Sequence, residues 1–217
     1  QIASWALPFS PGADGKLASN HLSGLSHWKI LDNLRRSLVA PALLILLVFG
    51  WLVMPHPVFW TIGLGLVFIL PAILNSLWQL AHLPKDLEFI PHLKETGKAF
   101  LDMLYPALFN MACLPFEAYI NMDAIVRTNW RLIFSRRKLL EWSPSHNHKF
   151  KPRRSLGKFY LVMWICPFII LLVTAFAIQK TMFIILYASP VLALWLLAPF
   201  IAWRISKPGT RRIAELA

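Results

Sequence analysis

The chain has 217 residues, of which 57% are hydrophobic and only 15% are charged. Soluble domains contain about 45–50% apolar and about 25% charged residues, so these proportions exclude a self-contained soluble enzyme and an intrinsically disordered region. The net charge of +12 is compatible with nucleic acid or anionic lipid as a partner. Because the sequence is so apolar, we favour an anionic lipid bilayer and expect no nucleic-acid partner.

The N-terminal segment contains two predicted elements. Residues 1–20 are rich in turn-forming residues and predict a loop or linker. The chain starts at Gln1 and shows no signal peptide, so we interpret it as part of a longer protein. Between His21 and Arg36, apolar residues recur every three positions, which predicts a basic amphipathic helix lying on the membrane surface.

Four long runs without charged residues predict transmembrane helices, because about 20 apolar residues cross the hydrocarbon core. They cover residues 38–54, 58–80, 159–178 and 181–203. Short turns at residues 55–57 and 179–180 would join them into two hairpins. The predicted fold is therefore an all-α polytopic membrane segment. Its expected parts are the linker 1–20, an interfacial helix with hairpin 1 (21–80), cytoplasmic interfacial helices with a basic loop (81–158), and hairpin 2 with a basic tail (159–217).

The distribution of basic residues predicts the orientation of these helices. Of the 22 lysines and arginines, 21 lie in the N-terminal segment, the middle segment or the C-terminal tail, and only Lys180 lies in a short turn. Cytoplasmic loops of membrane proteins carry an excess of lysine and arginine. We therefore expect the basic segments and both termini on the cytoplasmic side of a multi-pass protein.

The middle segment contains a further apolar stretch, residues 99–116. It includes Asp102, Asn110, Pro106 and Pro115, and a crossing here would place the next basic run outside. We therefore predict a kinked interfacial helix rather than a fifth span. A second amphipathic helix is expected over residues 116–142, followed by a basic loop.

Candidate chemical groups are few. The spans contain no Asp, Glu, Lys or Arg, which argues against an ion-coupled transporter or channel. His146 and His148 are too few for a metal site, so neither metal-binding nor catalytic residues are predicted. The basic, tryptophan-containing stretches 127–131 and 136–142 suit lipid headgroups or a nucleotide-sugar diphosphate, and composition does not separate the two. The residues expected at the membrane interface or a docking surface are Trp28, Arg35, Arg36, Arg127, Arg136, Arg137, Lys138 and Trp142.

Three stretches, residues 26–39, 123–132 and 135–142, resemble the membrane region of cyclic β-1,2-glucan synthases. That family implies a large bacterial inner-membrane protein with a processive glycosyltransferase domain upstream. It also implies glycoside-phosphorylase-like domains downstream. The resemblance implies UDP-glucose as donor and a divalent metal, Mg²⁺ or Mn²⁺, in the upstream domain, with no cofactor in this segment. Residues 1–20 would then be the linker from that catalytic domain.

The resemblance also implies candidate substrate-binding residues. Residues 1–5 are similar to the Gln-x-x-Arg-Trp motif of processive transferases, with Ser4 in place of the arginine. Gln1 and Trp5 are therefore expected to contact the growing glucan, and Trp130 and Arg131 to lie near substrate. The functional hypothesis is a membrane segment that anchors and supports a glucan synthase. The alternative is a purely structural membrane scaffold without a catalytic role.

Overall fold

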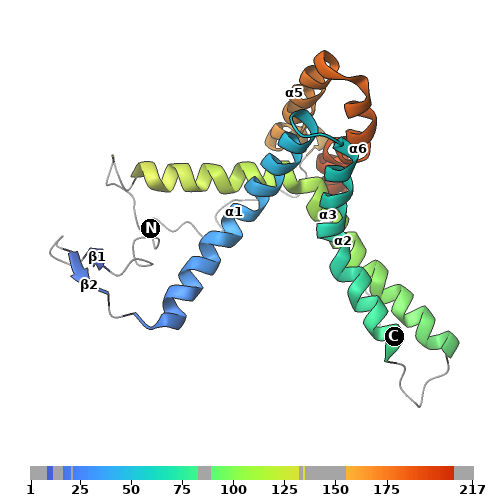
Figure 1. Ribbon diagram of the computed structural model, residues 1–217, viewed down its shortest axis with the longest axis horizontal. Coiled ribbons are helices and arrows are strands. Elements are labelled where there is room, and N and C mark those ends of the chain that lie inside the picture. Colours follow the sequence, from blue (N-terminus) through green and yellow to red (C-terminus); the bar gives the residue numbers. More distant parts are fainter. Residues whose placement is uncertain are drawn as a thin grey trace, which may run out of the picture. The chain divides into compact units, whose positions relative to one another are not determined.

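The computed structural model describes residues 9–11, 17–20, 22–82, 89–131, 134 and 155–207. These residues form two short strands and six helices (Figure 1). The elements are β1 (Phe9–Pro11), β2 (Leu17–Ser19), α1 (Gly24–Leu52), α2 (Pro57–Ala81), α3 (Phe89–Trp130), α4 (Leu156–Val162), α5 (Ile165–Lys180) and α6 (Met182–Ile205).

The chain divides into two compact units. Unit 1 comprises Gln1–Leu46 and Pro115–Lys149, and unit 2 comprises Leu47–Leu114 and Phe150–Ala217. Helices α1 and α3 therefore each contribute residues to both units.

The expected all-α membrane architecture is confirmed. Four helices, α1, α2, α3 and α6, are long and apolar enough to cross a membrane, and α4 with α5 makes a fifth candidate if this bent pair is one span. The segment 1–20, expected as a loop, contains one antiparallel pair of strands, with Phe9 opposite Ser19. Such a pair is too small to stand alone as a domain.

Helix α1 joins the predicted interfacial helix and the first predicted span into one continuous helix of 29 residues. Helix α2 begins at Pro57, after His56 in a left-handed conformation with φ of 60°. The pyrrolidine ring of Pro57 disfavours right-handed helical geometry at the preceding residue, which explains why α1 does not continue into α2.

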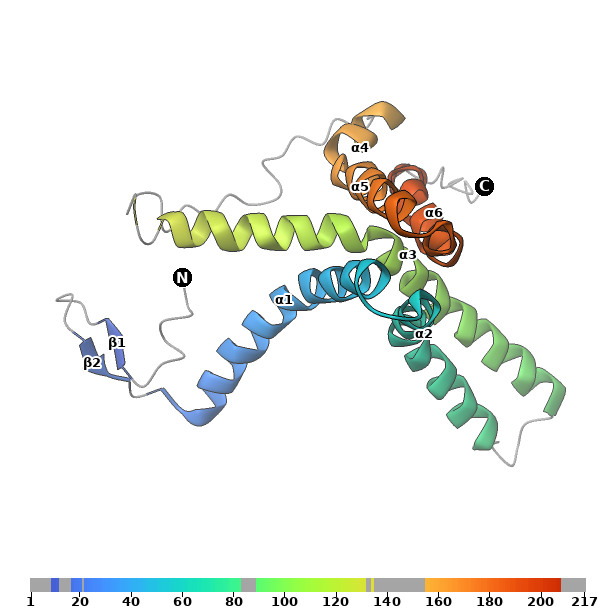
Figure 2. The ribbon, with the colours of Figure 1, turned by 45° about the horizontal axis from the view of Figure 1, so that its top comes forward.

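The third predicted span is not a single straight helix. Helices α4 and α5 meet at an angle of 63° around Met163 and Trp164, and the bend is visible in Figure 2. Pro167 lacks the backbone N–H that would bond to the carbonyl of Met163, and its ring would collide with that carbonyl in a regular helix. The Cys166 N–H instead bonds to the Met163 carbonyl at 3.0 Å. The predicted span over 159–178 is therefore interrupted by a bend.

Helix α3 also departs from the prediction. Two successive helices, over 99–116 and from Phe116, were expected, but the described residues form one helix of 42 residues. It is also long and apolar enough to be a candidate span, which was not expected. Pro115 removes the N–H partner of the Met111 carbonyl, and the indole N–H of Trp195 on α6 donates to that carbonyl at 3.2 Å. This bond explains how a continuous helix tolerates the proline.

The core of unit 2 is built around two fully buried tryptophans. Trp51 and Trp195 have ring centroids 5.8 Å apart at an interplanar angle of 49°. The Trp51 indole N–H donates to the Thr61 hydroxyl at 2.9 Å, so both indoles have a hydrogen-bond partner. The buried side chains around them are mostly aliphatic, among them Leu47, Val173, Ile184, Val191 and Leu192.

A hydrogen bond joins the ends of α1 and α5, next to the two short turns of unit 2. Lys180, at the end of α5, donates from Nζ to the Leu52 carbonyl at the end of α1, at 2.5 Å. The last carbonyls of a helix lack intrahelical donors and carry partial negative charge, so a lysine is favourable there. Lys180, which lies apart from the other basic residues in the sequence, thus links the two predicted hairpins.

Replacing Lys180 with methionine should keep its aliphatic length while removing the charge and the donor. Because the pair is exposed, we expect the free energy of unfolding to fall by only about 0.5–1 kcal/mol. Unfolding of the purified protein in mixed micelles, followed by circular dichroism, would measure this change. The difference between the variant and the parent should shrink at high salt. A salt-independent difference would contradict the electrostatic origin.

Candidate functional site in unit 1

The first half of α1 presents an exposed apolar stripe beside a charged one. Leu25 and Trp28 are 64% and 66% exposed. On the charged stripe, Asp32 accepts from Arg35 at 2.7 Å and from Arg36 at 2.8 Å. An exposed indole beside paired charges is typical of a helix at a membrane–water interface.

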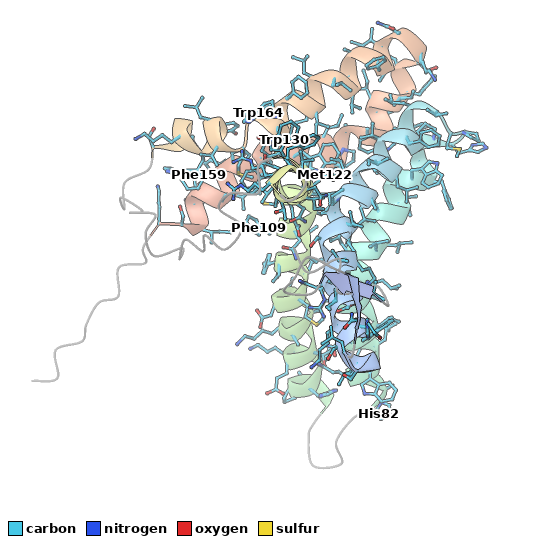
Figure 3. All side chains as sticks on the ribbon, turned by 90° about the vertical axis from the view of Figure 1, so that its left-hand side faces the viewer. His82, Phe109, Met122, Trp130, Phe159 and Trp164 are labelled. Atoms are coloured by element: carbon cyan, nitrogen blue, oxygen red, sulfur yellow. The ribbon has the colours of Figure 1, made fainter. Side chains whose placement is uncertain are left out.

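The part of α3 in unit 1 has the same character. Met122, Val126 and Trp130 are all exposed, and Met122 and Trp130 project from this part of the helix in Figure 3. The Trp130 ring lies 4.4 Å from that of Phe134, centroid to centroid. Arg127 pairs with Asp123 at 2.7 Å. Arg131 is exposed and forms no ion pair with any residue that the structure describes.

The predicted site residues therefore fall into two groups. Those on the described parts of α1 and α3 are exposed in unit 1: Trp28, Arg35, Arg36, Arg127, Trp130 and Arg131. The other predictions lie outside the described residues: Gln1, Trp5, Arg136, Arg137, Lys138 and Trp142. Their roles remain predictions.

A groove of about 270 Å³ lies between the parts of α1 and α3 that belong to unit 1. Its lining comes from two of the stretches that resemble glucan synthases: Leu34 and Ser37 from α1, and Ala124, Ile125, Thr128 and Asn129 from α3, with Asn121 one turn earlier. Sequence reasoning missed these residues. The spacing of Asn121, Ile125 and Thr128 places them on one helix face, but it does not reveal which segment faces them.

A second, larger cavity of about 550 Å³ lies in unit 2 at the end of the α2–α3 hairpin, near His82 in Figure 3. The rings of Trp78 and His82 stack with centroids 3.9 Å apart, and His92 Nε2 lies 2.9 Å from the Gln79 carbonyl. Thr96 is only 3% exposed, and its hydroxyl has no hydrogen-bond partner within the described part of the chain. None of these residues was predicted as part of a site.

Within the described ranges, no group of three or more His, Cys, Asp or Glu side chains is placed to hold a metal ion. Cys113 is half-buried and Cys166 is buried, and the two are not joined in a disulfide. The described site therefore offers hydrogen-bonding, aromatic and cationic groups. These groups bind and position ligands, and by themselves they form neither a nucleophile–base pair nor a metal centre.

Several helices of this length and apolarity define a multi-pass membrane protein segment. Over 190 residues, or 87% of its length, the chain is 28% identical to the cyclic β-(1,2)-glucan synthase NdvB of Rhizobium meliloti (strain 1021). The resemblance seen in the sequence is thus confirmed. The chain spans only 7% of the length of that relative, so it corresponds to a segment of it. No family model matches the chain.

Proposed function

We propose that this chain is the membrane-embedded segment of a cyclic β-glucan synthase. It anchors and supports a cytoplasmic glycosyltransferase that polymerises glucose from UDP-glucose. The observation that carries the proposal is the similarity to a cyclic glucan synthase along most of this chain. In this account the divalent metal, Mg²⁺ or Mn²⁺, and the catalytic residues belong to the upstream domain. The downstream partner is a glycoside-phosphorylase-like domain of the same protein.

The one-sided distribution of basic residues supports an inner-membrane location with the loops and both termini in the cytoplasm. In that orientation, the turn containing Lys180 faces the periplasm. The exposed surfaces of unit 1 would lie where anionic headgroups, nucleotide sugar and the catalytic domain all occur. The part of α3 in unit 1 would then lie along the interface, because a crossing there would move the basic residues 131–158 to the opposite side.

In unit 1, Trp130 and Arg131 form the surface that we assign to support of the transferase. An indole can stack on a sugar ring or pack on a protein surface, and a guanidinium pairs with phosphate or carboxylate. Both side chains are exposed in the described structure, so they are available to a partner.

Replacing Trp130 and Arg131 together with alanine in the intact parent protein tests this role. We expect glucose incorporation from UDP-glucose to fall by about tenfold or more, because one aromatic contact and one charged contact are removed. Membrane insertion, measured by protease protection, should be unchanged. Leu93 and Lys94 form an exposed apolar–basic pair on α3 outside the predicted site, and their double alanine variant should lose far less synthesis.

The alternative function, a structural scaffold without a catalytic role, predicts a different result. A scaffold should tolerate the Trp130 and Arg131 substitutions with synthesis intact. If the variant lost membrane insertion and glucan synthesis to the same extent, the segment would serve only as a membrane anchor.

A further inference from the structure

We propose that the groove between α1 and α3 in unit 1 binds a glucose unit of the glucan chain. This inference rests on the proposed function and assigns a substrate subsite that the sequence did not predict. It starts from a juxtaposition: two stretches separated by more than eighty residues, 26–39 and 123–132, line the same groove.

The chemistry of the lining favours a neutral, hydroxyl-rich ligand. None of the described lining residues is charged. Two amides and two hydroxyls, from Asn121, Asn129, Ser37 and Thr128, can each donate and accept hydrogen bonds, as sugar hydroxyls do. Leu34 and Ile125 supply an apolar surface for the C–H face of a sugar ring.

Most of these polar groups are free to form hydrogen bonds with a ligand. Asn121 and Thr128 are half-buried, Asn129 is exposed, and no side chain of the three forms a hydrogen bond within the described part of the chain. Only Ser37 is engaged, donating to the Asn33 carbonyl at 3.1 Å. A site with partly buried, unpaired amides and hydroxyls favours a ligand that satisfies them over one that does not.

The surrounding charges argue against a phosphate or lipid headgroup in the groove. Arg35 and Arg36 are paired with Asp32, and Arg127 is paired with Asp123. These three guanidinium groups thus lie in ion pairs, and within the described part of the chain neither they nor the unpaired Arg131 line the groove. The volume of about 270 Å³ is near the lower end of the roughly 300–1,000 Å³ of small-molecule sites, which suits a short part of a polymer.

Photo-crosslinking in the intact parent protein tests the assignment. A photoreactive phenylalanine analogue replaces Ala124 in the groove, and inner membranes synthesise glucan from radiolabelled UDP-glucose before illumination. We expect labelled glucan to become attached to the protein at position 124. The matched control position is Ile45 on α1, which is 66% exposed and lies in the apolar part of the helix, so it should capture lipid and no label.

Two substitutions then remove hydrogen bonding while preserving side-chain size. Asn121→Leu and Thr128→Val should each reduce labelled capture at position 124 by about fivefold, and together by about twentyfold or more. Protease protection verifies that each variant is inserted and folded. Undiminished capture in the double variant would overturn the assignment of these groups.

The outcomes separate the two proposals. Membranes that incorporate no glucose from UDP-glucose would refute the proposed function itself. Membranes that make labelled glucan, while position 124 captures only lipid or captures nothing, would leave the proposed function standing and refute the groove assignment.

Discussion

Replacing Trp195 with alanine is expected to lower the free energy of unfolding by about 3 kcal/mol or more, as is typical when a large aromatic side chain is removed from a core. Trp195 is fully buried against Trp51 in unit 2. Its indole also supplies the donor for the Met111 carbonyl, which Pro115 leaves without a helical partner. The substitution therefore creates a cavity and leaves a buried acceptor unpaired.

The two contributions can be separated with Trp195→Phe. Phenylalanine retains an aromatic ring but removes the N–H donor, so a smaller loss of about 1–2 kcal/mol is expected from the unpaired carbonyl and the lost ring volume. Unfolding of the purified protein in mixed micelles would provide both values. Trp28→Ala is the matched control, because Trp28 is 66% exposed, and it should change stability by no more than about 0.5 kcal/mol. Equal losses at Trp28 and Trp195 would contradict the packing described for unit 2.

The second large effect is expected at Gly50, where α1 meets α2. A Cβ atom at Gly50 would overlap Cγ of the Trp60 ring, far inside van der Waals contact. Alanine is intrinsically better than glycine in a helix by about 0.5–1 kcal/mol. Overpacking costs about 1–3 kcal/mol, and occasionally more, so the clash outweighs the propensity gain and Gly50→Ala should destabilise the protein.

A double variant tests this explanation, because the effect of Gly50→Ala on the free energy of unfolding should change from destabilising to stabilising. In a Trp60→Ala background the clash is absent, so adding Gly50→Ala should stabilise the protein by about 0.5–1 kcal/mol. Gly63→Ala is the matched control on α2, since nothing lies within 4 Å of a Cβ at that position, and it too should be stabilising. Destabilisation by Gly50→Ala that persists without the Trp60 ring would contradict the clash.

The membrane architecture follows from the sequence because it depends on local composition. Runs of uncharged residues and the Pro55-His56-Pro57 turn predict the end of α1 and both bounds of α2 and α6 within a few residues. The bend between α4 and α5 has a local cause as well, since Pro167 acts on the carbonyl of Met163. Hydropathy alone hides such a break, because the residues on both sides of it are equally apolar.

The continuity of α3 could not be predicted because it depends on a distant residue. Pro106 and Pro115 indicate a kink or an end, and only the Trp195 indole on α6 satisfies the carbonyl that Pro115 frees. The groove could not be predicted for the same reason, since its two walls come from distant parts of the sequence. Asn121, Thr128 and Asn129 look like an ordinary polar stripe on a helix until Leu34 and Ser37 are placed opposite them. By contrast, the amphipathic helix that carries Trp28 was predictable from the three-residue spacing of its apolar residues.

If this segment belongs to a working glucan synthase, the intact parent protein should transfer glucose from UDP-glucose into glucan. The intact parent protein is expressed, inner membranes are prepared, and transfer of labelled glucose from UDP-glucose into glucan is measured in the presence of Mg²⁺ or Mn²⁺. We expect incorporation that depends on the parent protein. Absence of incorporation by protein shown to be inserted and folded would contradict it, and would leave the similarity to cyclic glucan synthase as shared membrane architecture.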